Sequence, residues 1–64
     1  MALSKVTARR ILKDAGADRV SDSAALELAE LVDRYAYSLA KKAVSLAAHA
    51  KRKTIQKADI DLAK

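Results

Sequence analysis

One uninterrupted stretch, from Ser21 to Ala50, constrains the fold more than any other feature of the sequence. It contains neither glycine nor proline and is rich in alanine, leucine, glutamate and lysine, residues that favour helix. Its apolar residues recur at spacings of three and four, the pattern of one helix face. The residues of this face are Ala25, Leu28, Ala29, Val32, Ala36, Leu39, Ala40, Ala43, Leu46, Ala47 and Ala50. Because further apolar residues flank the face, we expect the helix to be covered on more than one side.

The helix predicted over this stretch is too long for the rest of the chain to cover. About 28 helical residues span roughly 42 Å, whereas a compact globule of 64 residues has a diameter of about 28 Å. The flanking segments are too short to enclose such a rod. We therefore expect a second copy of the chain to cross the long helix and complete the core, so that the folded unit is an intertwined homodimer.

Shorter segments on either side predict an all-α fold in the order short helix, long helix, short helix. Ser4 or Thr7 is placed to cap the first helix. Gly16, the only glycine, follows Ala15, where a left-handed helix end is expected.

The remaining boundaries follow from similar signals. Ser21 or Asp22 is placed to cap the long helix. After Ala50 comes a basic loop, and a third helix of about two turns is predicted from Lys57 to Lys64.

Composition argues against several classes of function. With no cysteine and a single histidine, the chain lacks the residues of a disulfide or a usual zinc centre, and we expect no metal and no cofactor. His49 has no partner of a catalytic constellation, so we expect neither an enzyme nor a small-molecule substrate. No apolar run approaches the ~18 residues of a membrane span, and no secretion signal is visible. These absences predict a soluble intracellular protein without a membrane partner, with one domain over residues 1–64 and no tails.

Positive charge is concentrated in two parts of the chain. The net charge is +5, but residues 14–33 hold six acids and only Arg19, whereas residues 34–57 hold seven bases and no acid. The first 13 residues add four bases and no acid. A small basic protein is a candidate for binding a polyanion, although charge alone leaves open a soluble surface of uneven charge.

The two predicted loops carry the most promising cations. Arg19 lies in the first loop, and Lys51, Arg52, Lys53 and Thr54 form the second. Helix N-termini beside such loops offer free amides to phosphate. The chain has no phenylalanine or tryptophan to stack on bases and no long basic helix to read a major groove. The pattern therefore favours binding to the backbone of duplex nucleic acid, largely independent of base sequence.

Two segments, ILKDAGADRVSDSA and AAHAKRKTIQKADIDLA, closely resemble the archaeal histones, and the similarity extends over nearly the whole chain. The resemblance implies the histone fold, in which a long middle helix crosses its partner in an intertwined dimer. It also implies double-stranded DNA as the partner and a nucleoid-associated protein of the cytoplasm. Dimers would assemble into tetramers or longer superhelical stacks that bend and wrap DNA and so compact chromatin.

The resemblance also assigns roles to individual residues. Arg19 would enter the minor groove without reading bases, with Thr54 of the partner subunit beside it, and narrow A/T-rich grooves would be preferred through their shape. Phosphate-facing or backbone-facing positions are Arg10, Lys13, Lys53 and Ser21. Arg52 and Asp59 match a salt bridge that holds the second loop on the third helix; the alternative is a surface pair worth less than ~1 kcal/mol.

Further implied roles concern assembly. The positions that would join dimer to dimer as a four-helix bundle are Leu46, His49, Asp59 and Leu62. Gly16 is compatible with close approach of neighbouring turns of a superhelix. Lys51 replaces a usual glycine after the long helix, where a left-handed cap would cost about 1 kcal/mol.

Two other functions remain open at this stage. One is a histone-fold dimer that only bends or bridges DNA. The other is a helical protein-interaction module whose basic charge is incidental. A membrane-surface helix is less well supported, because acids fill the first half of the long helix. A related chain is a possible alternative to the second identical copy.

Overall fold

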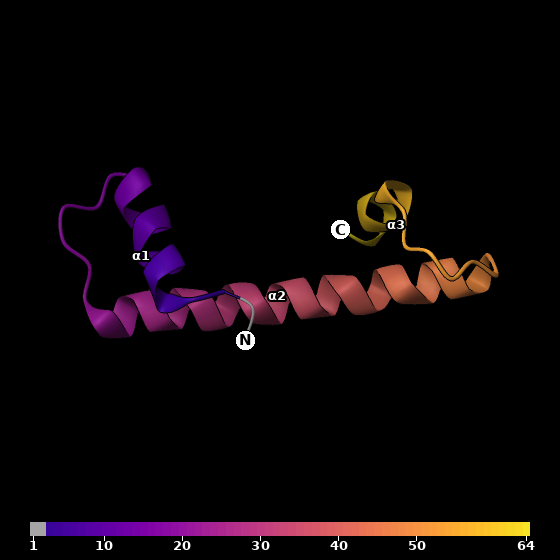
Figure 1. Cartoon of the computed structure of the whole chain (residues 1–64), viewed down its shortest axis with the longest axis horizontal. Helices are drawn as coiled ribbons and strands as arrows, with labels where there is room; N and C mark the ends of the chain where they lie inside the picture. Colours follow the sequence, from indigo (N-terminus) through magenta and orange to yellow (C-terminus); the bar gives the residue numbers. More distant parts are fainter. Residues whose placement is uncertain (1–2) are drawn as a thin grey trace. The chain divides into compact units, whose positions relative to one another are not determined.

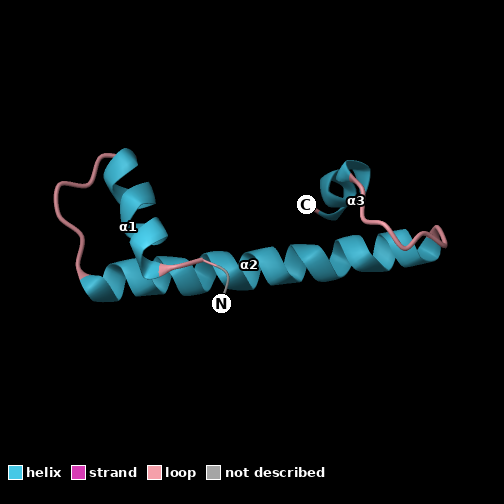
Figure 2. Cartoon of the chain, viewed as in Figure 1, coloured by secondary structure: helices cyan, strands magenta, loops and turns pink. Residues whose placement is uncertain are grey.

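The computed structural model describes residues 3–64 and consists of three helices joined by two loops (Figures 1 and 2). The helices are α1 (Lys5–Asp14), α2 (Asp22–His49, 28 residues) and α3 (Lys57–Ala63). No strand occurs among residues 3–64. The all-α fold and the predicted order of helix lengths are confirmed. No helix in this part of the chain combines the length and apolar character needed to cross a membrane.

The helices α1 and α2 each begin at a serine whose hydroxyl satisfies a free amide of the first turn. Ser4 caps α1, and its hydroxyl accepts a hydrogen bond of 3.0 Å from the Thr7 amide. The Ser21 hydroxyl accepts one of 3.1 Å from the Ala24 amide at the start of α2. These bonds decide between the two candidates that the sequence left open for each cap, because an N-cap oxygen pairs with an amide two or three residues on.

The C-terminal ends of α1 and α2 have the same hydrogen-bond pattern. After α1, the Gly16 amide donates to the Lys13 carbonyl and the Ala17 amide to the Leu12 carbonyl, both at 3.0 Å. After α2, the amides of residues 51 and 52 donate to the carbonyls of residues 48 and 47, both at 2.9 Å. This paired closure needs a left-handed residue, which is Gly16 (φ 117°) in the first case and Lys51 (φ 59°) in the second. The predicted left-handed positions are confirmed.

The chain consists of two compact units whose boundary lies within α2. The first unit ends at Arg34 and the second begins at Tyr35. In the first unit, α1 packs against the N-terminal part of α2 through three small buried residues, Ala8, Ala25 and Ala29. Leu3, Val20 and Leu28 pack around them.

In the second unit, the buried residues of α2 are again alanines. Ala43 and Ala47 are buried on α2, and Ala63 and Asp59 are buried on α3. A carboxylate in such a position needs partners, because burying an unpaired charge is costly.

The larger apolar side chains remain substantially exposed in the single chain. Among residues 3–64, every fully buried hydrophobic residue is an alanine. The large apolar residues left exposed are Val6, Ile11, Leu26, Leu31, Val32, Tyr35, Tyr37, Val44, Ile55, Ile60 and Leu62. Burying a side chain of this size is worth about 1.5–3 kcal/mol, so one copy leaves most of its available hydrophobic stabilisation unused.

Candidate nucleic-acid interface

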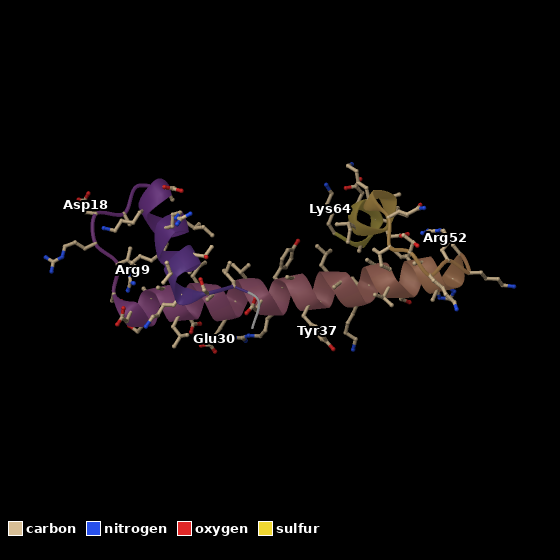
Figure 3. All side chains as sticks on the ribbon, in the orientation of Figure 1. Arg9, Asp18, Glu30, Tyr37, Arg52 and Lys64 are labelled. Atoms are coloured by element: carbon tan, nitrogen blue, oxygen red, sulfur yellow. The ribbon has the colours of Figure 1, made fainter. Side chains whose placement is uncertain are left out.

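The first loop, residues 15–21, carries Arg19 between two well-defined ends. It opens with the paired hydrogen bonds at Gly16 and closes at the Ser21 cap. Within it, Lys13 Nζ donates a 2.8 Å hydrogen bond to the carbonyl oxygen of Asp18, the residue labelled on this loop in Figure 3. Arg19 is exposed, and within residues 3–64 its side chain forms no hydrogen bond or ion pair. The guanidinium is therefore available for an external anion.

The start of α2 is tied back to α1 by an ion cluster. Arg9 forms a hydrogen-bonded ion pair with Asp22, the first residue of α2, and Lys5 Nζ lies 3.9 Å from Asp22 Oδ2. Arg9 is labelled in Figure 3, where its side chain points toward this end of α2. The Arg9 hydrogen bond and the charges of Lys5 and Arg9 lower the pKa of Asp22 below its ordinary value. The acid nearest the Ser21 cap is thus ionised and paired with two cations.

The second loop, residues 50–56, is held by a buried ion pair. Arg52 donates to both carboxylate oxygens of Asp59, at 2.8 and 2.9 Å. The Asp59 side chain is only 3% exposed, and its Oδ2 also accepts a 2.8 Å bond from the Gln56 amide. The hydrogen bonds from Arg52, and then the one from Gln56, lower the pKa of Asp59 to about 2. One carboxylate therefore fixes both the loop and the start of α3.

The same arginine also restrains the tip of the second loop. Arg52 Nη1 donates a 3.2 Å hydrogen bond to the Thr54 carbonyl oxygen. Lys51, Lys53 and Thr54 are exposed, and neither lysine forms an ion pair within the described residues. This loop thus presents two free cations on a backbone held by the Asp59 carboxylate.

The other predicted site residues are distributed as follows. Arg10 is exposed on α1, and Gly16 is exposed with open space where a Cβ would stand. Leu46 and Leu62 line an open depression between the C-terminal part of α2 and α3, together with Lys42, Ser45 and Ala63. His49 is exposed, whereas Asp59 is buried against Arg52. The structure thus brings Leu46 and Leu62 together on one surface of the second unit.

Sequence reasoning did not find the ion cluster of Lys5, Arg9 and Asp22. Arg9 and Asp22 are 13 positions apart, so no helix spacing relates them. The sequence shows that the two residues have opposite charges, but their contact depends on how α1 packs on α2. Among residues 3–64, no group of three or more acidic or histidine side chains is arranged to hold a metal ion.

Comparison with known proteins gives a consistent result. The sequence model of the family described as "histone-like transcription factor (CBF/NF-Y) and archaeal histone" matches residues 1–63. The chain is 48% identical over 54 residues to one of the subunits of the archaeal histone HAN1 from Thermococcus zilligii. It is 50% identical over 54 residues to the probable archaeal histone 3 of Methanocaldococcus jannaschii. Each alignment covers 84% of this chain and 81% of the relative.

Proposed function

Because the chain belongs to the family of histone-like transcription factors and archaeal histones, we propose that it binds, bends and wraps double-stranded DNA as a component of chromatin. The two relatives named as archaeal histones support this proposal over an enzymatic role. The observation that carries it is the pair of loops, with Arg19 as the free cation of the first and Lys51 and Lys53 as those of the second, each on a restrained backbone. Such a surface suits contact with a phosphate backbone without base reading.

The binding unit that we propose is a dimer of two identical copies. Large apolar side chains remain exposed along all three helices of the single chain, while the fully buried hydrophobic residues of its described part are all alanines. A second copy crossing α2 in the opposite direction would cover these side chains. Because a folded single copy would lack this burial, folding and dimerisation are expected to be coupled. A related chain with the same apolar pattern could replace one copy.

Pairing of this kind would place the first loop of one copy beside the second loop of the other. Arg19 would then enter the minor groove, with Thr54 of the partner subunit beside it. Lys13, Lys53 and Arg10 would face phosphates, and Ser21 would lie where the amides at the start of α2 meet the DNA backbone.

Assembly beyond the dimer would use the end of α2 and α3. The exposed His49 and Leu62 and the half-buried Leu46 are the side chains that we propose to meet a second dimer, with Asp59 behind them. Gly16, which has open space around it, would allow neighbouring turns of a superhelix to approach. The resulting protein would be associated with the nucleoid.

Salt dependence of binding tests the DNA contact. The logarithm of affinity for a random duplex should fall steeply with the logarithm of salt concentration, by about 0.9 for each neutralised phosphate. Arg19→Ala should weaken binding to all sequences and reduce any preference for A/T-rich DNA, and Lys57→Met is the matched loss of a cation outside both loops. A flat salt dependence would instead favour a protein-interaction module.

Nuclease digestion of reconstituted complexes separates wrapping from bending alone. Stacked dimers should protect DNA in a ladder of equal steps, and His49→Ala should shorten the ladder while leaving dimers intact in sedimentation. A single protected length that does not grow with protein concentration would favour a dimer that only bends or bridges DNA.

A further inference from the structure

The hydrogen bond from Lys13 to the backbone of the first loop gives this lysine a second role. We propose that Lys13 is a positioning residue for Arg19, acting through the Asp18 carbonyl, in addition to being a cation near phosphate. This inference rests on the proposed DNA binding. It starts from one contact, the 2.8 Å bond between Lys13 Nζ and the Asp18 oxygen.

A side chain that bonds to the Asp18 carbonyl can restrain the backbone amide of Arg19. The C=O of Asp18 and the N–H of Arg19 belong to the same peptide unit, which is planar. A donor bonded to the oxygen therefore restrains the whole peptide unit, including the amide nitrogen of Arg19. Because Lys13 belongs to the last turn of α1, the bond fixes the backbone of Arg19 relative to a regular helix.

The middle of the first loop has few other restraints. The paired hydrogen bonds after α1 end at the Ala17 amide, and the next cap begins at Ser21. Among the described residues, Lys13 is the only side chain that donates to the backbone between these two points. Without it, Asp18 and Arg19 would lose the one side-chain hydrogen bond to their backbone, which leaves the packing of Val20 on the core as the nearest restraint, and Arg19 would have to be ordered on binding.

The two roles of Lys13 lead to different energetics. A lysine that only meets phosphate contributes independently of Arg19, so its loss adds to the loss of Arg19. A lysine that also positions Arg19 contributes partly through it, so once Arg19 is absent its loss retains only the phosphate part of the effect. A double-mutant cycle measures this difference.

The cycle uses the full-length protein with Lys13→Met, Arg19→Ala and both changes together, and Lys57→Met as the matched removal of a cation. Binding is measured on an A/T-rich and a G/C-rich duplex of equal length. Lys13→Met should weaken A/T-rich binding by about three- to tenfold, as expected for one lost hydrogen bond, and reduce the A/T preference. In the Arg19→Ala background Lys13→Met should weaken binding clearly less than it does in the wild type, because only its phosphate contribution remains to be lost, whereas Lys57→Met should have the same small effect in both backgrounds. Lys13→Arg, which keeps a donor, should restore most of the affinity.

Relaxation of backbone amides in the DNA-free protein supplies the second measurement. Lys13→Met should lower the order parameters of the Asp18 and Arg19 amides while leaving α1 and the start of α2 unchanged. Equal losses in both backgrounds of the cycle, or unchanged order of these amides, would overturn the positioning role and leave the proposed function intact. A wild-type protein that binds neither duplex would overturn the proposed function itself, together with this role in binding.

Discussion

The two loops of this protein both need a left-handed residue after a helix and a cation bonded to a loop carbonyl, and different residues fill these positions. Each follows a helix that closes with paired hydrogen bonds around a left-handed residue, which is Gly16 in the first loop and Lys51 in the second. In each, a cationic side chain donates to a loop carbonyl. The first cation, Lys13, is exposed, whereas the second, Arg52, is fixed on a buried carboxylate.

This difference predicts opposite sensitivities to substitution. The first loop depends on the conformational freedom of a glycine, so a side chain at Gly16 should be harmful. The second loop has a strained lysine at the equivalent position, and the residues that follow it are held by the hydrogen bonds of Asp59 with Arg52 and Gln56. Removing the carboxylate should therefore damage the second loop more than any single change damages the first. Stabilities are compared at one fixed protein concentration, because the folding of the proposed dimer would depend on it.

Asp59→Asn should have the largest effect. The change leaves Arg52 without its charge partner in a half-buried site and weakens the bond to the Gln56 amide, and losing one member of a buried pair is strongly destabilising. We expect the melting temperature to fall by about 10 °C or more, measured by circular dichroism.

Asp61→Asn is the matched control for this change. Asp61 lies on the same helix but pairs at the surface with Lys57, whose side chain is 89% exposed. Surface pairs contribute little, so the melting temperature should change by no more than a few degrees. If both asparagine variants melt together, the Asp59 carboxylate does not hold the second loop.

The stability of the protein should depend on pH through the ionisation of the Asp59 carboxylate. The pKa of Asp59 is about 2 in the folded protein, below its ordinary 3.8. A depressed pKa means that the stabilising contribution is complete above the unfolded value and is lost as pH falls toward the folded value. Stability should therefore decline between about pH 4 and pH 2. A carboxyl carbon of Asp59 that titrates near 4 in a folded-state NMR experiment would contradict the assignment.

The contrast between the loops also shows what the sequence could predict. The position of Gly16 after a helical run was enough to predict a left-handed end, because that signal is local, whereas the left-handed position of Lys51 came from the resemblance, in which a glycine is usual there. The resemblance named Arg52 and Asp59 as a pair. The bonds to backbone atoms of Asp18 and Gln56 were not predictable, because every residue has a carbonyl and an amide and only the folded path decides which ones a side chain reaches.

In the core, too, the sequence predicted a pattern but not the contacts that fill it. Periodicity predicted a long apolar face on α2, and its small residues Ala25, Ala29, Ala43 and Ala47 are the ones buried within the single chain. The larger residues on and beside that face include Val32, Leu31 and Val44, which remain exposed. Spacing identifies a face that needs covering, but it does not say which part a neighbouring helix of the same chain covers.

Gly16→Ala should destabilise through backbone strain alone. At φ +117° a Cβ would meet no atom within 4 Å, so steric clash with neighbours is not a factor. The conformation itself should cost about 1–2 kcal/mol, measured by denaturant unfolding. Gly16→Asn should lose less, since asparagine enters the left-handed region more readily. Equal stability of the alanine variant and the wild type would mean that the loop relaxes to another path.

Lys51→Gly should have the smallest effect and the opposite sign. Glycine relieves the strain of a lysine at φ 59°, while it also makes the unfolded chain more flexible. The two effects partly cancel, and we expect a gain of at most about 1 kcal/mol. Lys53→Gly removes the same charge from the same loop at a residue that does not have a positive φ, so it should lower stability. If both glycine variants are destabilised equally, the left-handed lysine carries no strain, and the two loops differ only in how their cations are anchored.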